Sequence, residues 1–141
     1  MRSGIRKSWL AGGMVIVDTS AWIPFFNRPD STEKQIIEEL IDRGDVAIVG
    51  VILAELLQGC RSQEERDELK EALLALPYLG VSQGTWIAAG ELSAGLLRKG
   101  ITLPLTDLVI AAAAIEHHCS VYSLDAHFQK IPGLIRYSPA G

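Results

Sequence analysis

The sequence predicts an α/β protein in which a central parallel sheet is covered by helices on both faces. Short runs of β-branched residues alternate along the chain with longer segments whose apolar residues repeat at helical spacing. Helices that separate successive strands are typical of parallel sheets. The 141 residues, 48% of them hydrophobic and 21% charged, suffice for one globular domain with a buried core.

The first half of the chain is predicted to contain two strands and four helices. Gly44 and Gly59 end two of the helices, because glycine readily adopts the conformation that follows a helix. Ser62 and Glu65 have the spacing of a capping box, which predicts the start of another helix. The predicted elements are a strand at 15–17, a helix after Asp18, a helix at 31–43, a strand at 45–50, and helices at 51–59 and between Ser62 and Pro77.

The second half is predicted to contain two helices and three short strands. The first helix has basic residues in its last turn, which suits the helix dipole, and Gly100 follows it. The second helix is rich in alanine. The predicted elements are a strand at 78–82, helices at 84–100 and 106–118, and strands at 120–124 and 134–137.

Residues 14–141 are predicted to form a single domain, preceded by a flexible extension at 1–13. The apolar piece of this extension is too short for a secretory signal. No apolar stretch reaches the ~20 residues of a membrane span, so we expect no membrane association. Cys60 and Cys119 lack the spacing of a metal or redox motif and are expected to be free thiols of a cytoplasmic protein.

Four acidic residues stand where a purely structural sequence would not require them. Asp18 and Asp125 follow the predicted strands at 15–17 and 120–124, and Asp107 opens the alanine-rich helix. Glu55 is the only charged residue between positions 45 and 61. Ligands of parallel sheets collect outside the carboxyl ends of the strands, which is where such residues would lie.

Each acid also has a separate structural explanation. Asp18 would accept hydrogen bonds from nearby backbone amides, and Asp125 would cap a short helix. Thr106 would cap the helix at 106–118, where an acid such as Asp107 gains ~0.3–1 kcal/mol from the helix dipole. Glu55 would point to solvent. One explanation covers all four instead: the acids converge and a divalent cation removes their mutual repulsion.

Carboxylate ligands without histidine or cysteine favour a hard ion, Mg²⁺ or Mn²⁺, over zinc. Such an ion orients phosphate oxygens and lowers the pKa of a bound water, which then attacks a phosphodiester in line. The acids therefore predict a metal-dependent phosphodiesterase site. Either one or two ions fit four carboxylates.

The chain resembles the PIN-domain nucleases, and among them the VapC toxins of toxin–antitoxin modules. The resemblance runs from about Met14 to the end of the chain. It implies a three-layer α/β/α sandwich, ribonuclease activity, a divalent metal, a homodimer, and a VapB-type antitoxin that occludes the site. The matching motifs are VIVDTSAWI with Asp18, VILAELLQGCRS with Glu55, LTDLVIAAAAI with Asp107, and VYSLDAHFQKIPGL with Asp125.

The resemblance implies a role for each matching residue. Asp18 and Asp107 would be the main metal ligands, and Glu55 and Asp125 would complete the acidic pocket directly or through water. Three hydroxyl residues would orient these acids: Ser20, Thr106 and Ser123. The chain departs from the family two residues after Asp125, where many relatives have another acid and this chain has His127. This departure bears on how a second metal would be held.

The net charge of −4 argues weakly against nucleic-acid binding. The four proposed site acids account for this net charge, because the other 13 acidic residues are balanced by the 13 lysines and arginines. Phosphate contacts would come from basic residues near predicted loops or helix ends, although ordinary solvated surface charge explains each of them as well. The candidates are Arg28, Arg61, Arg98, Lys99 and Lys130.

Two other function classes stay open at this point. One is another Mg²⁺-dependent phosphohydrolase on a similar sheet, although Ser20 stands where an aspartate-nucleophile phosphatase usually has a second acid. The other is a non-catalytic PIN-like module that binds RNA or a partner protein. The helices at 31–43 and 51–74 are expected to carry antitoxin and dimer contacts.

Overall fold

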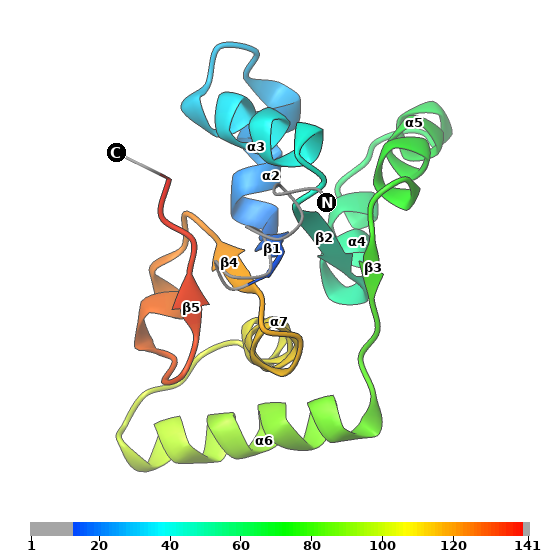
Figure 1. The fold of residues 1–141 in the computed structure, drawn as a ribbon. Helices are drawn as coiled ribbons and strands as arrows, with labels where there is room; N and C mark the ends of the chain where they lie inside the picture. Colours follow the sequence, from blue (N-terminus) through cyan, green and yellow to red (C-terminus); the bar gives the residue numbers. More distant parts are fainter. Residues whose placement is uncertain (1–12, 140–141) are drawn as a thin grey trace, which may run out of the picture.

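The computed structural model describes residues 13–139, so the predicted extension at 1–13 lies outside the described residues except for Gly13. Five strands form one sheet in the order β3-β2-β1-β4-β5, and every neighbouring pair is parallel (Figure 1). The strands are β1 (Val15–Val17), β2 (Val46–Val49), β3 (Tyr78–Leu79), β4 (Ser120–Tyr122) and β5 (Ile135–Arg136). The predicted α/β class with a parallel sheet is confirmed.

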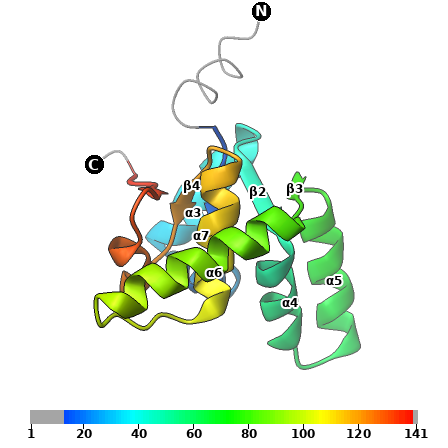
Figure 2. The same cartoon turned by 90° about the horizontal axis from the view of Figure 1, so that it is seen from below.

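Helices cover both faces of the sheet, as predicted. Figure 1 shows α7 end-on against one face, with α6 outside it, whereas α2 and α3 lie on the opposite side. Seen from below, α6 runs across α7 (Figure 2). The helices are α2 (Thr19–Asn27), α3 (Thr32–Asp42), α4 (Gly50–Gln58), α5 (Gln63–Leu74), α6 (Gln83–Arg98), α7 (Leu105–Glu116) and the 3₁₀ helix η1 (Ala126–Lys130).

The core consists of the central strands and the helices beside them. Every residue of β1, β2 and β4 is buried, which explains their unbroken apolar or small-residue runs. Helix α7 is buried from Leu108 to Ala114, and its alanines allow the sheet and α6 to approach closely. No helix of the described part is long and apolar enough to cross a membrane.

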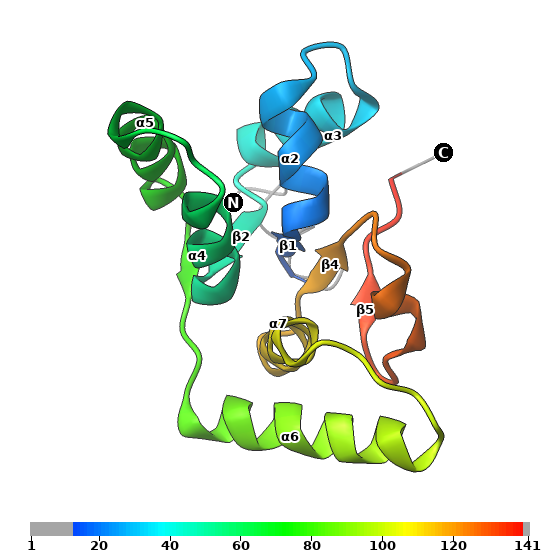
Figure 3. The same cartoon turned by 180° about the vertical axis from the view of Figure 1, so that it is seen from behind.

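The strand order changes direction at β1. From β1 the chain builds the sheet outward through β2 and β3, and then returns to place β4 on the other side of β1 (Figure 3). Ligands of open parallel sheets bind at such a switch point, outside the carboxyl ends of the strands. Residues that follow β1 and β4 therefore meet there. Helix α7 leads into β4 and runs opposite to it, so the first turn of α7 lies at the same edge.

Two predictions about helix caps differ from the structure. Thr106 does not cap its helix: α7 begins one residue earlier, and Pro104 is the N-cap, without a side-chain hydrogen bond. The carbonyl of Pro104 accepts from the amides of Asp107 and Leu108, so the helix starts before the Thr106 hydroxyl stands at a capping position. Ser62 does cap α5, but Glu65 accepts from the amide of Arg61 at 2.6 Å, which is one residue ahead of the predicted partner.

Candidate active site

Asp18 lies at the switch point and is held by two hydroxyl groups. Its amide donates to the carbonyl of Tyr122 at 2.9 Å, which continues the pairing of β1 with β4 by one residue. The carboxylate is 6% exposed, and its Oδ2 accepts from Ser20 Oγ at 2.8 Å and from Ser123 Oγ at 2.9 Å. Among residues 13–139, no hydrogen bond ends on Oδ1. That oxygen is therefore left for another partner.

Backbone amides orient both hydroxyls toward Asp18. The amide of Leu124 donates to Ser20 Oγ at 2.9 Å, and the amide of Asp125 donates to Ser123 Oγ at 3.0 Å. A hydroxyl that accepts from an amide still has one hydrogen to donate, and here that hydrogen is aimed at the carboxylate. Ser20 on α2 and Ser123 after β4 thus both hold the carboxylate that follows β1.

Asp107 lies in the first turn of α7, and its side chain is 14% exposed. Burial raises the pKa of this carboxyl, the hydrogen bond from His127 lowers it, and the negative charges of Asp18 and Asp125 raise it further. The net shift is upward. Asp18 and Asp107 are thus close enough to repel each other, although the segments that carry them are far apart in sequence.

Asp125 and His127 approach Asp107 from the turn after β4. Asp125 caps η1 by accepting from the amide of His127 at 2.9 Å, which confirms the predicted cap. His127 Nδ1 lies 2.7 Å from Asp107 Oδ2 and 3.2 Å from Asp125 Oδ1. The turn after β4 therefore brings an imidazole, a potential nitrogen ligand, into contact with two acids of the site.

Glu55 is half-buried on α4, and its Oε1 accepts from Thr19 Oγ1 at 2.7 Å. Because Thr19 follows Asp18 directly, this bond ties α4 to the start of α2 beside the site. The alternative in which Glu55 only faces solvent is wrong. Thr19 was not among the predicted site residues; a hydroxyl directly after the strand-end aspartate is the signal that would have identified it.

The donor set fits a divalent ion. One ligand atom each of Asp107, Asp125 and His127 lies within 4.8 Å of the others. Asp18 is not one of these three residues, but its negative charge is close enough to raise the pKa of Asp107. Several carboxylate oxygens suit a hard divalent cation as ligands. A bound cation would also remove the repulsion between these carboxylates.

Comparison with known proteins identifies the family. The PIN domain pattern matches residues 15–134. Ribonuclease VapC21 of Mycobacterium tuberculosis is 31% identical over 103 residues, which are 71% of this chain and 75% of VapC21. The chain belongs to the VapC ribonucleases of the PIN-domain family. VapC ribonuclease Mb1587 of Mycobacterium bovis is 29% identical over 122 residues, 84% of this VapC-family chain and 91% of the relative.

Solved structures of VapBC complexes have the same fold as this VapC-family chain. VapBC2 from Rickettsia felis, bound to a DNA fragment from its promoter, superimposes with a TM-score of 0.76 at 25% identity. The match covers 88% of this chain and 97% of that one. The three-layer arrangement that the resemblance implied is thereby confirmed for this VapC-family chain.

The raised pKa of Asp107 predicts how the stability of this VapC-family chain depends on pH without divalent ions. Between the ordinary value of 3.8 and the raised value, the folded protein binds more protons than the unfolded chain. The free energy of unfolding therefore falls as pH rises through this interval. We expect the Tm of the wild type in EDTA, relative to that of Asp107→Asn, to fall as pH rises from 3.8 through the raised pKa, and then to level off. A constant difference would contradict the raised pKa.

Proposed function

We propose that this chain is a divalent-metal-dependent endoribonuclease and the toxin of a toxin–antitoxin module. The observation that carries the proposal is the meeting of acidic side chains from separate elements at the switch point of the sheet. Asp18 follows β1, Asp107 begins α7, and Asp125 follows β4. Family membership and the relatives named ribonucleases support the same activity.

Asp18 and Asp107 would hold the ion, with Glu55 and Asp125 as further ligands, directly or through water. Mg²⁺ or Mn²⁺ suits these oxygens, and when bound it would orient the phosphate and activate a water for hydrolysis. The protein's own contribution is positioning. Ser20 and Ser123 hold Asp18 Oδ2, which would leave the other carboxylate oxygen available to the ion.

RNA would be held by exposed basic side chains at helix ends. Arg28 follows α2, Arg98 and Lys99 end α6, and Lys130 ends η1. A short connection joins the end of α6 to the start of α7, which supports a role for Arg98 and Lys99 near Asp107. Arg61 is the remaining candidate. Contacts to phosphate position a nucleic acid without reading its sequence.

A VapB-type antitoxin would bind beside the site. A groove of about 500 Å³ runs between α2, α4 and α5, and Thr19 and Glu55 are among its lining residues. Ile23 and Phe26 also line the groove and are 49% and 43% exposed, so a partner would bury apolar surface there. We propose that such a partner occludes the site, that the toxin forms a homodimer, and that it acts in the cytoplasm, where RNA substrates occur.

Cleavage of RNA by the purified protein tests the proposed function. We expect structured RNAs to be cut at internal positions with Mg²⁺ or Mn²⁺ and to stay intact when EDTA replaces the metal. Gel analysis of end-labelled transfer, ribosomal and messenger RNA reports the cleavage. RNA binding without cleavage of any of them, together with no divalent-ion binding by calorimetry, would instead indicate a non-catalytic binding module.

A further inference from the structure

The imidazole of His127 contacts two members of the acidic group. Nδ1 contacts oxygens of both Asp107 and Asp125, at 2.7 Å and 3.2 Å. The side chain of His127 is 39% exposed, so an ion from solvent can reach the ring. The same ring nitrogen that contacts both carboxylates can present a lone pair to a cation in the neutral tautomer that carries its hydrogen on Nε2.

The local fold places this nitrogen before any ion binds. Asp125 Oδ1 accepts from the amide of His127 at 2.9 Å, which fixes the start of η1. Phe128, the next residue, is 2% exposed and anchors the same turn in the core. The ring position therefore follows from two local constraints, and little side-chain order would have to be gained on binding.

The distances suit ligands of a single ion. Adjacent ligand atoms of a six-coordinate ion with bonds of about 2.1 Å stand about 3 Å apart. The two distances from Nδ1, 2.7 Å and 3.2 Å, lie on either side of this value. An ion bound to Nδ1 and to either carboxylate oxygen would therefore require little change in these two distances.

We propose that His127 is a nitrogen ligand of the site's divalent ion and makes this chain bind Mn²⁺ in preference to Mg²⁺. The proposal rests on the metal site of the proposed function. Mg²⁺ keeps oxygen ligands and water, whereas imidazole nitrogen binds first-row transition ions more strongly. A site built from carboxylates alone lacks that source of discrimination.

Electron paramagnetic resonance of bound Mn²⁺ tests the proposal directly. The untagged protein is loaded with Mn²⁺, and pulsed measurements detect the magnetic coupling of a ¹⁴N nucleus to the ion. Protein labelled with ¹⁵N-histidine assigns the coupling to imidazole. We expect this coupling in the wild type and in His118→Asn, and its loss in His127→Asp. His118 is a matched control because it is exposed and its φ of 57° is a conformation that asparagine tolerates.

Competition between the two ions gives a second readout. The resonance signal of free Mn²⁺ rises as added Mg²⁺ displaces bound Mn²⁺. A titration therefore gives the Mg²⁺ concentration at which half of the bound Mn²⁺ is displaced. We expect His127→Asp to require about tenfold less Mg²⁺ than the wild type. If His127→Asp fails to fold by circular dichroism, His117→Gln and His118→Asn still assign the ¹⁵N coupling by elimination, because the chain has 3 histidines.

The experiment distinguishes failure of the ligand role of His127 from failure of the proposed metal-dependent ribonuclease activity. Bound Mn²⁺ without coupling to histidine nitrogen, or coupling that persists in His127→Asp, would overturn the role of His127 and leave the metal-dependent ribonuclease in place. No binding of Mn²⁺ at all would overturn both the ligand role and the metal dependence of the proposed function.

Discussion

Replacing Asp18 by asparagine is expected to lower RNA cleavage by at least about 10³-fold while preserving the fold. The substitution keeps the shape of the side chain, and an amide oxygen still accepts from Ser20 and Ser123. It removes the charge that Oδ1 would offer to the ion. Initial rates of cleavage in Mn²⁺, with protein purified in the same way as the wild type, measure the effect and separate it from contaminating nuclease.

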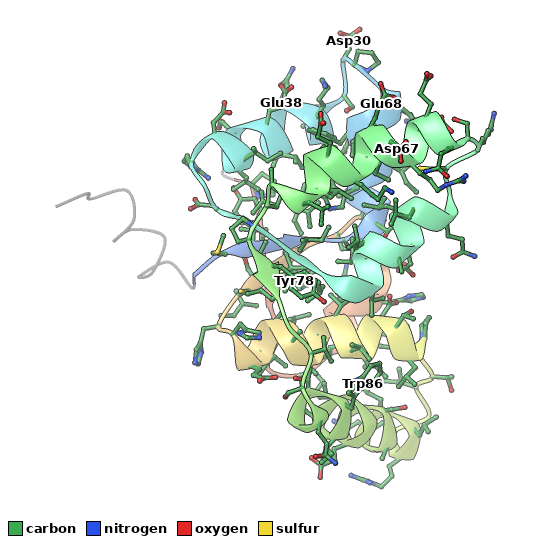
Figure 4. All side chains as sticks on the ribbon, turned by 90° about the vertical axis from the view of Figure 1, so that its right-hand side faces the viewer. Asp30, Glu38, Asp67, Glu68, Tyr78 and Trp86 are labelled. Atoms are coloured by element: carbon green, nitrogen blue, oxygen red, sulfur yellow. The ribbon has the colours of Figure 1, made fainter. Side chains whose placement is uncertain are left out.

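The same substitution should not weaken the metal-free protein. The charge of Asp18 raises the pKa of Asp107, so its removal relieves repulsion within the site. We expect a Tm in EDTA equal to or above that of the wild type. Asp30→Asn is the matched control, because Asp30 is exposed in the turn between α2 and α3, at the far end of α2 from Asp18 (Figure 4). Wild-type cleavage by Asp18→Asn would refute the role of this carboxylate.

Replacing Trp22 by alanine is expected to lower the free energy of unfolding by about 3–5 kcal/mol. Trp22 is 1% exposed and packs edge-on against Phe25 and stacked on Phe26, with ring centroids 5.1 Å and 5.7 Å apart. Alanine would leave a large cavity between α2 and its neighbours. Urea unfolding followed by far-UV circular dichroism measures the loss without depending on tryptophan fluorescence.

Trp22→Phe should cost less than half as much as Trp22→Ala. The indole Nε1 of Trp22 is buried and has no hydrogen-bond partner among residues 13–139. An unpaired buried donor costs roughly 1–3 kcal/mol, and phenylalanine removes that cost while filling most of the space. Trp86→Ala is the comparison on α6: its side chain is 53% exposed, and we expect a change within about 0.5 kcal/mol (Figure 4). A loss for Trp22→Phe equal to that for Trp22→Ala would contradict the expected gain from removing an unpaired Nε1.

Several features could be predicted because local chemistry decides them. The three β-branched residues before Asp18 predict a buried strand, and helical spacing predicts α3 and α7 within a few residues of their observed bounds. The serine at position 123 could be assigned to the site because the resemblance placed it there. The strands at 78–82, 120–124 and 134–137 are shorter than predicted, since strand length depends on which partner lies beside them.

Other features depend on contacts between distant segments. The bond from Thr19 to Glu55 joins residues 36 positions apart, and no spacing rule relates them. His127 looked like a missing acid, whereas the structure brings its Nδ1 between two carboxylates.

The sequence by itself determined the parallel α/β class, the placement of acids at strand ends, and the family resemblance. These depend on residue type and on periods of a few residues, which are properties of the chain alone. Only the tertiary structure decided that Asp107, Asp125 and His127 meet, and that the charge of Asp18 lies near them. Their approach results from the pairing of β1 with β4 and from the opposite direction of α7, and pairing between distant segments is not encoded in any short stretch.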